Sequence, residues 1–143
     1  MTRIIRPALI LFALALFSIN AVGQATDKPD ADVTKLNVVW SSADPDVAMN
    51  VCFMFTLNAK RRGWFDTVHL IVWGPSAKLL TENEQLQEQI TAMQEEGVVI
   101  EACRACAERY EVADQLAEMG IDVDWMGVPL ADRLKGDWKT ITF

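Results

Sequence analysis

The stretch "VVIEACRACAER", residues 98–109, contains the pattern that decides how this chain folds. Its first half is a short apolar run, which is typical of a buried strand. Its second half begins near Cys103 and has the composition of a short helix. A strand that leads directly into a helix is the repeating unit of parallel α/β proteins, so this stretch predicts an α/β fold.

The same alternation continues on both sides of this stretch. The predicted strands are residues 36–40, 67–73, 98–102, 121–125 and 138–143. The predicted helices are residues 47–62, residues 76–96 with a break near Thr81, the segment that carries Cys103 and Cys106, residues 112–119 and residues 129–135. Strands that alternate with helices predict a parallel sheet covered by helices on both faces, and therefore one three-layer α/β domain.

The first predicted helix has clear start and stop signals. Asp44 can cap it, and Pro45 fits its first turn. Basic residues 60–62 lie at its electronegative C-terminal end, and Gly63 ends it. The apolar residues that recur along it at helical spacing are Val47, Val51, Met54, Phe55 and Leu57.

The N-terminus has the pattern of a secretory signal. Two arginines precede an unbroken apolar stretch, residues 8–17, and small residues follow at Ala21 and Gly23. The apolar stretch is shorter than the roughly 20 residues that span a membrane. The pattern predicts a signal peptide over residues 1–23 rather than a retained membrane anchor. We therefore expect the mature protein to be periplasmic or secreted.

The segment after the signal, residues 24–35, is polar and without periodicity, which predicts a flexible leader. The folded domain is then residues 36–143. The chain has 13 basic and 20 acidic side chains, a net charge of −7, and loss of Arg3 and Arg6 with the signal takes this to about −9. A surface this acidic repels phosphate backbones, so the composition argues against nucleic-acid partners.

The three cysteines, Cys52, Cys103 and Cys106, form an odd set. Small exported domains that depend on disulfides carry more cysteines, in even number. We therefore expect the apolar core to hold the fold, which frees the thiols for chemistry or packing. Cys52 lies in the middle of the first predicted helix, and we interpret it as a core residue.

The carboxyl ends of the strands are where parallel α/β proteins bind their ligands. Cys103 follows the third predicted strand directly, so topology places it at this edge. It also lies at a predicted helix N-terminus, which favours a thiolate, and Cys106 follows one turn later. The other residues that we expect to line a pocket at this edge are Ser41, Ser42, Trp73, Gly74, Met126 and Gly127.

The spacing of Cys103 and Cys106 allows several interpretations. A structural zinc site needs about four ligands, and besides this pair the chain offers only Cys52 and His69, so we expect no bound metal. A thioredoxin-like motif would follow the first strand of its fold, whereas this pair follows the third. Simple packing of two small residues at a helix start also explains the pair.

No other catalytic motif, such as a nucleophile elbow or a glycine-rich phosphate loop, occurs in the sequence, and we expect no cofactor. Three acids, Asp44, Asp46 and Glu101, lie near the carboxyl edge, and capping explains Asp44. His69 lies inside an apolar strand, where we expect a packed or solvent-facing side chain rather than a ligand.

Four stretches of the chain, in their order and spacing, resemble the DsrE/DsrF-like family of small sulfur-relay proteins. They are "VVWSSADPDVAMNVCFMFTLNAKRRG", "VHLIVWGPSAKLL", "GVVIEACRACAERYEV" and "MGIDVDWMGVPLADRLKGDWKTITF". The resemblance covers about residues 36–143. It implies a three-layer α/β/α sandwich on a five-stranded, mainly parallel sheet, and a homo-oligomer that is commonly a trimer or hexamer.

In sulfur-relay members of this family, a cysteine just after the third strand accepts sulfur as a persulfide and passes it on. Cys103 occupies this position, so the resemblance implies that role for Cys103, and Cys106 is its candidate resolving or protecting partner. The family's well-understood relays are cytoplasmic, whereas this chain carries an export signal. The expected function is an exported, sulfurtransferase-like sulfur carrier whose partner is a donor or acceptor protein or a small thiol.

Two other functions stay open at this point. A chain of this fold can be a non-catalytic ligand-binding or assembly module, because one fold serves many functions. The CxxC pair would also suit a dithiol redox protein. The module should tolerate loss of Cys103, which separates it from the other two.

Overall fold

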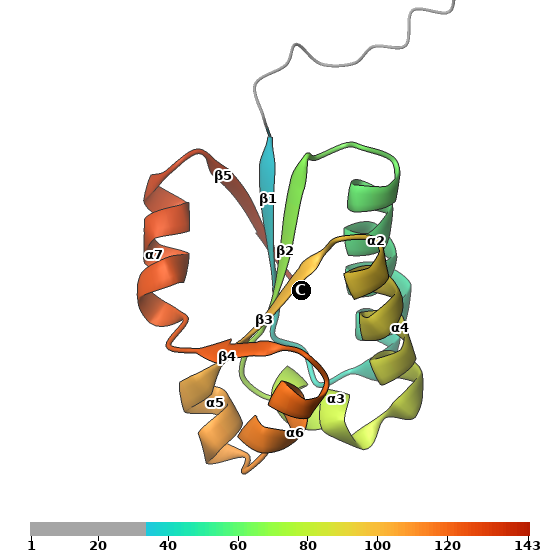
Figure 1. Cartoon of the computed structure of the whole chain (residues 1–143), viewed down its shortest axis with the longest axis vertical. Coiled ribbons are helices and arrows are strands. Elements are labelled where there is room, and N and C mark those ends of the chain that lie inside the picture. Colours follow the sequence, from blue (N-terminus) through green and yellow to red (C-terminus); the bar gives the residue numbers. More distant parts are fainter. Residues whose placement is uncertain (1–33) are drawn as a thin grey trace, which may run out of the picture.

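The computed structural model describes residues 34–143, which form a five-stranded sheet between two layers of helices (Figure 1). The strand order is β4-β3-β2-β1-β5, and all neighbouring pairs are parallel. The strands are β1 (Lys35–Trp40), β2 (Thr67–Val72), β3 (Val99–Cys103), β4 (Asp122–Asp124) and β5 (Trp138–Thr142). The predicted three-layer α/β/α fold is confirmed, and its sheet is entirely parallel.

The predicted signal peptide, residues 1–23, lies outside the described residues, as does the predicted leader up to residue 33. The last leader residue, Lys35, is already part of β1, where it pairs with Thr67 and Trp138. Its ammonium lies 3.0 Å from the Asp137 carboxylate, which satisfies the charge at the start of the strand.

The helices are distributed unequally over the sheet. Figure 1 shows α2 and α4 on one side, α7 alone on the opposite side, and α3, α5 and α6 gathered at one end of the sheet. The helices are α1 (Pro45–Val47), the π-helix η1 (Ala48–Phe53), α2 (Met54–Arg61), α3 (Ser76–Glu82), α4 (Glu84–Glu95), α5 (Arg104–Arg109), α6 (Ala113–Glu118) and α7 (Gly127–Lys135). Within residues 34–143, no helix has the length and apolar character needed to cross a membrane.

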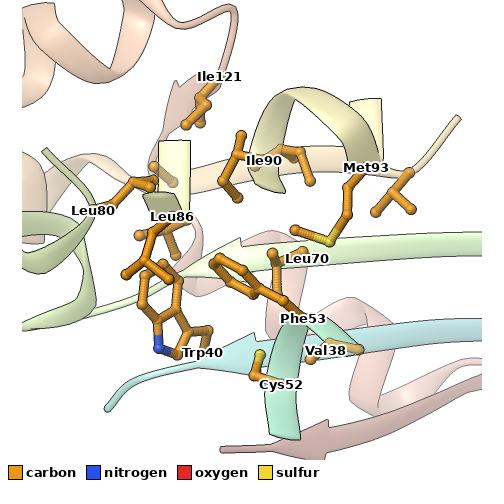
Figure 2. Packing of buried hydrophobic residues seen from close by; sticks show 14 of the residues in the cluster. Val38, Trp40, Cys52, Phe53, Leu70, Leu80, Leu86, Ile90, Met93 and Ile121 are labelled. Atoms are coloured by element: carbon orange, nitrogen blue, oxygen red, sulfur yellow. The ribbon is translucent and has the colours of Figure 1, made fainter. Parts of the chain in front are cut away.

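The main core lies between the sheet and the layer that contains α2 and α4 (Figure 2). Strand side chains alternate between the two faces, so Val38 and Trp40 of β1 point into this core together with Leu70 of β2. The Trp40 and Phe53 rings meet edge to face, with centroids 4.8 Å apart. The helices contribute fully buried apolar side chains that include Phe53, Leu80, Leu86, Ile90 and Met93.

A smaller apolar cluster lies on the opposite face of the sheet, beneath α7. It consists of Val39, Ile71, Cys103 and Met126, and we call it the thiol cluster. Trp73, Cys106 and Leu130 are partly buried and pack against it. We call this side of the sheet the α7 face.

The segment that follows β1 starts as predicted. The Asp44 carboxylate accepts hydrogen bonds from the backbone N–H groups of Asp46 and Val47, at 2.8 and 3.3 Å, and Pro45 is the first helical residue. The next six residues form a π-helix, which the sequence did not predict.

The core-facing side of this segment differs from the predicted apolar set. Two members of that set, Val51 and Met54, are 43% and 57% exposed. The residues buried against the sheet are mostly small: Ala48, Cys52, Phe53, Thr56 and Ala59. Small side chains let a helix lie close to a sheet, and a π-turn shifts the helical spacing, so the search for large apolar residues finds Phe55 and Leu57, which pack against the core, but also selects the exposed Val51 and Met54.

The long predicted helix over residues 76–96 is two helices. The break is at Asn83, two residues beyond the predicted position, where the side chain caps α4 by accepting a hydrogen bond from the Leu86 N–H at 3.1 Å. The last predicted helix begins at Gly127, two residues earlier than expected.

Candidate functional site

Cys103 is the last residue of β3 and directly precedes α5. It therefore lies at the carboxyl edge of the sheet, at the start of a helix of six residues. Its side chain points to the α7 face and belongs to the thiol cluster, so only 5% of the residue is exposed. The candidate thiol is thus at the expected edge but beneath the molecular surface.

Cys106 lies in the first turn of α5 and is half-buried beside the thiol cluster. Burial raises the pKa of its thiol, a hydrogen bond from the backbone of Gly74 acts in the opposite direction, and the neighbouring Cys103 thiol raises it further. The net effect is a raised pKa. Both cysteines are free thiols, and Cys103 is close enough to raise the pKa of Cys106.

Three of the predicted pocket residues lie around this thiol pair. Trp73 packs against the thiol cluster, Met126 is part of it, and the backbone of Gly74 hydrogen-bonds the Cys106 thiol. Gly74 has a φ of 71°, a left-handed conformation that favours glycine and that turns the chain between β2 and α3. Gly127, the first residue of α7, is exposed.

Ser41 and Ser42 make different contacts at the carboxyl edge. The backbone N–H and the hydroxyl of Ser41 both donate to the carbonyl of Phe143, at 2.8 and 3.0 Å, which ties the end of β1 to the end of the chain. The Ser42 hydroxyl accepts a hydrogen bond from the Asp44 N–H at 3.1 Å. These bonds give both serines a structural role, and β2 separates their strand from β3.

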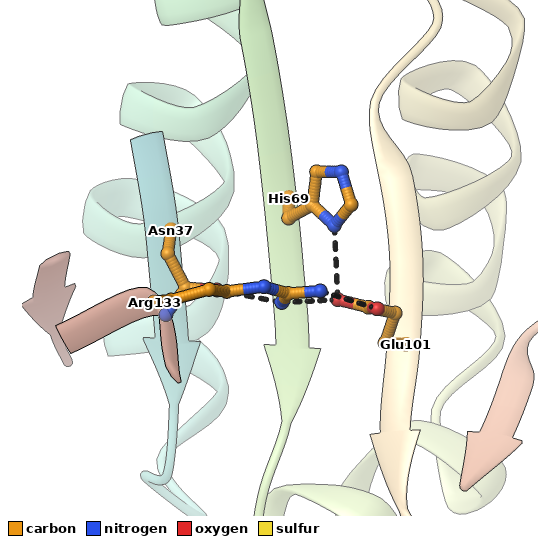
Figure 3. A network of polar contacts seen from close by, with 4 residues as sticks. All are labelled: Asn37, His69, Glu101 and Arg133. Atoms are coloured by element: carbon orange, nitrogen blue, oxygen red, sulfur yellow. Dashed lines mark hydrogen bonds and ion pairs between the residues drawn. The ribbon is translucent and has the colours of Figure 1, made fainter. Parts of the chain in front are cut away.

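A buried ion pair lies two residues from Cys103 on the same face of the sheet. Arg133 of α7 donates Nη1 to Oε2 and Nη2 to Oε1 of Glu101, at 2.6 and 2.7 Å (Figure 3). Both side chains are nearly buried, with 12% and 11% of their surfaces exposed. This two-pronged geometry is the strongest form of an arginine–carboxylate contact.

Further contacts extend the ion pair across the sheet. Nδ1 of His69 lies 3.0 Å from Oε2 of Glu101, and Arg133 Nη1 also donates to Oδ1 of Asn37 at 3.0 Å. Trp138 of β5 stacks its ring edge to face with His69, at 4.8 Å, and lies 5.0 Å from the Arg133 guanidinium. Arg133 of α7 therefore contacts side chains from three strands and, through Glu101, is linked to a fourth.

The charge of Glu101 is stabilised by its partners. Burial by itself would raise the pKa of the carboxyl group, but hydrogen bonds with His69 and Arg133, together with their charges, lower it from 4.5 to about 2. Glu101 is therefore ionised at neutral pH, and the guanidinium compensates it.

The sequence alone does not predict this network. It indicates an acid near the carboxyl edge at Glu101 and a packed or solvent-facing His69, and it gives no sign of a role for Arg133. The signal was a carboxylate between Ile100 and Ala102 in an apolar strand, because a buried charge requires a partner. The identity of that partner is a tertiary contact.

Among residues 34–143, no three histidine, cysteine or acidic side chains are grouped so that they could hold a metal ion. Two surface hollows, of about 290 and 200 Å³, are not lined by the cysteines, although the second includes Ala43 and Pro75 from the loops that follow β1 and β2. The thiol pair is therefore the chemically distinctive feature of the carboxyl edge.

Comparisons with known proteins agree with the fold. The sequence profile of the DsrE/DsrF-like family matches residues 34–143. The solved structure of a conserved protein of unknown function from Bacteroides thetaiotaomicron is similar, with a TM-score of 0.74 and 38% sequence identity, and the match covers 76% of this chain and 94% of that one. No curated protein matches the sequence.

Proposed function

Because this chain belongs to the DsrE/DsrF-like family, we propose that it carries or transfers sulfur as a persulfide on Cys103. The family suggests a role related to sulfur relay, and the persulfide on this residue is the specific form that we propose. The observation that supports it most is the thiol pair, Cys103 at the carboxyl edge of β3 with Cys106 beside it.

The proposed transfer requires no external oxidant or reductant. The Cys103 thiolate attacks the outer sulfur of a donor persulfide, R–S–SH, the donor S–S bond breaks, and the donor leaves as a thiolate. Cys103 then carries the S–SH group. An acceptor thiolate attacks the outer sulfur of this group in turn and releases the Cys103 thiolate.

The surroundings of Cys103 suit a stored persulfide. Val39, Ile71 and Met126 enclose the sulfur in apolar side chains, which limits contact with water and oxidants. Cys106 can attack the inner sulfur of the persulfide, which forms a Cys103–Cys106 disulfide and releases hydrosulfide. The raised pKa of Cys106 keeps this thiol protonated more of the time and so slows that loss.

We also propose that the mature protein is exported and self-assembles. Export rests on the signal pattern of residues 1–23, and assembly as a trimer or hexamer rests on the family resemblance. The partner is a donor or acceptor protein or a small thiol. The acidic chain argues against a nucleic acid.

Mass spectrometry of protein purified from its native compartment tests the function. The peptide that contains Cys103 should be heavier by one sulfur atom, and reduction should remove this addition. Cys103→Ser should abolish the persulfide, whereas Cys52→Ala, which alters a cysteine in the other core, should retain it. A persulfide that persists in Cys103→Ser, or wild-type protein that never acquires one from a persulfide donor, would contradict the proposal.

A dithiol oxidoreductase would use the same two free thiols, Cys103 and Cys106. Rapid reduction of a substrate disulfide that requires both cysteines would favour the redox function instead.

A further inference from the structure

We propose that α7 is a lid over the Cys103 thiol and that the Arg133–Glu101 ion pair is the latch that holds the lid closed. The inference concerns access to the thiol that the proposed function uses, and in that sense it rests on the proposed function. Arg133 and Glu101 are positioning residues in this scheme, since neither belongs to the thiol cluster.

The lid side of the thiol cluster comes from α7 and the residue before it. Met126 directly precedes the helix and is buried in the cluster, and Leu130, in the first turn of α7, packs against it. Figure 1 shows α7 on its own side of the sheet, opposite α2 and α4. Displacement of α7 would therefore expose Cys103 and leave the main core intact.

The spacing of Leu130 and Arg133 on α7 matches the spacing of Cys103 and Glu101 on β3. Leu130 and Arg133 are three residues apart and lie on the same side of α7, while Cys103 and Glu101 are two apart on the same face of β3. The helix α7 runs back from the carboxyl edge to the start of β5, antiparallel to the strands. When Arg133 is bonded to Glu101, Leu130 therefore lies nearer the carboxyl edge, on the side of Cys103.

The remaining contacts of α7 hold it weakly. Within the described chain, none of its nine residues is fully buried. Two of its large apolar side chains, Val128 and Leu134, are 70% and 62% exposed and so add little to its attachment. Arg133, with its bonds to Glu101 and Asn37 and its contact with Trp138, is the most extensively bonded residue of the helix.

The consequence is selection by size. A small sulfur compound needs only a slight movement of α7 to reach Cys103, whereas a bulky donor or a partner protein needs the lid to open. Cys106 is half-buried beside the cluster, so its accessibility depends less on the lid.

Timed labelling of the full-length native protein tests the lid, with iodoacetamide as the small probe and fluorescein maleimide as the bulky one. The three cysteines report separately by peptide mass: Cys103 on the lid, Cys106 on the neighbouring surface, and Cys52, fully buried in the main core, on global unfolding. In Arg133→Met, the rate at Cys103 should rise about tenfold or more with the bulky probe, as expected when a buried ion pair is broken.

The same experiment should show less change at Cys103 with iodoacetamide and little at Cys106. Cys52 labels only on global unfolding, so it should accelerate only as far as the loss of global stability requires and stay much slower than Cys103. Arg61→Met is the matched control, because Arg61 forms an exposed pair with Glu96 at 2.8 Å, remote from the thiol cluster. Arg133→Lys, which keeps the charge but loses the fork, should label at an intermediate rate. This variant provides the test if Arg133→Met does not fold.

The lid is wrong if Cys103 in the Arg133 variants labels no faster than in wild type. It is also wrong if Cys103 and Cys52 label at the same rate in these variants, because that result means that Cys103 is reached by global unfolding rather than by local opening. These outcomes do not depend on whether Cys103 ever carries a persulfide. Failure of the lid and failure of the proposed function can therefore be told apart.

Discussion

Arg133 and Glu101 are 32 residues apart in sequence, yet both terminal nitrogens of the guanidinium lie within 2.7 Å of the two carboxylate oxygens. The pair connects the last helix of the chain to the strand that carries Cys103. Because it is almost completely buried, removal of either partner leaves an uncompensated charge. The ion pair therefore affects both the stability of the fold and the covering of the thiol.

Loss of the arginine should destabilise the protein strongly. We expect Arg133→Met to lower the free energy of unfolding by about 3 kcal/mol, because Glu101 stays buried without its counter-charge. Arg61→Met should cost less than about 1 kcal/mol, since that pair is exposed. Urea unfolding followed by circular dichroism measures both, and equal losses in the two variants would contradict the importance of burial.

The stability should depend on acid pH through Glu101. Its pKa is about 2 in the folded protein and ordinarily 4.5, so the folded state favours the ionised form. The resulting stabilisation is complete above the ordinary pKa and is lost as the pH falls from 4.5 to 2. Glu101→Gln should therefore show a weaker pH dependence than wild type in this window. Urea midpoints at several pH values provide the measurement, and parallel curves would rule out this contribution.

Cys52 should remain unreactive in the native protein. It is completely buried, and burial raises the pKa of its thiol to about 12, although a hydrogen bond with Thr56 acts in the opposite direction. Alkylation should occur only with global unfolding. Timed alkylation at increasing urea concentration measures this. Labelling of Cys52 in the native protein at the rate seen in unfolded protein would contradict the prediction.

The pKa of Cys106 should fall when its neighbour is removed. Burial is the main cause of its raised pKa, but the Cys103 thiol raises it further through hydrogen bonding and charge. In Cys103→Ser, the pH profile for alkylation of Cys106 should therefore shift to lower pH, while Cys52→Ala should leave the profile unchanged. An unshifted profile in Cys103→Ser would mean that the two thiols do not communicate.

Self-association should be detectable in solution. The end of the chain presents apolar side chains, with Ile141 38% exposed and Trp138 and Phe143 partly buried, and the family resemblance implies a trimer or hexamer. Light scattering at high micromolar concentration should give a mass several times that of one chain. A single-chain mass would contradict the proposed assembly.

The order of secondary structure, and with it the fold class, followed from the sequence alone. Apolar runs such as Thr67–Val72, and stop signals such as Gly63, are local features that act within a few residues. The Asp44 cap was also predictable from the sequence. Its carboxylate accepts hydrogen bonds from N–H groups only two and three residues later, so it needs no distant partner. The position of Cys103 at the carboxyl edge then followed from the topology of parallel sheets.

Only the tertiary structure decided how these elements meet. The sequence placed Ser41 and Cys103 at the same edge, but the strand order sets β2 between their strands. The sequence showed a carboxylate, Glu101, in an apolar strand but did not identify its partner. Arg133 reaches Glu101 only when α7 packs on that face of the sheet. Such contacts depend on which surfaces become neighbours in space, and this is determined by the packing of the whole domain rather than by any local stretch of chain.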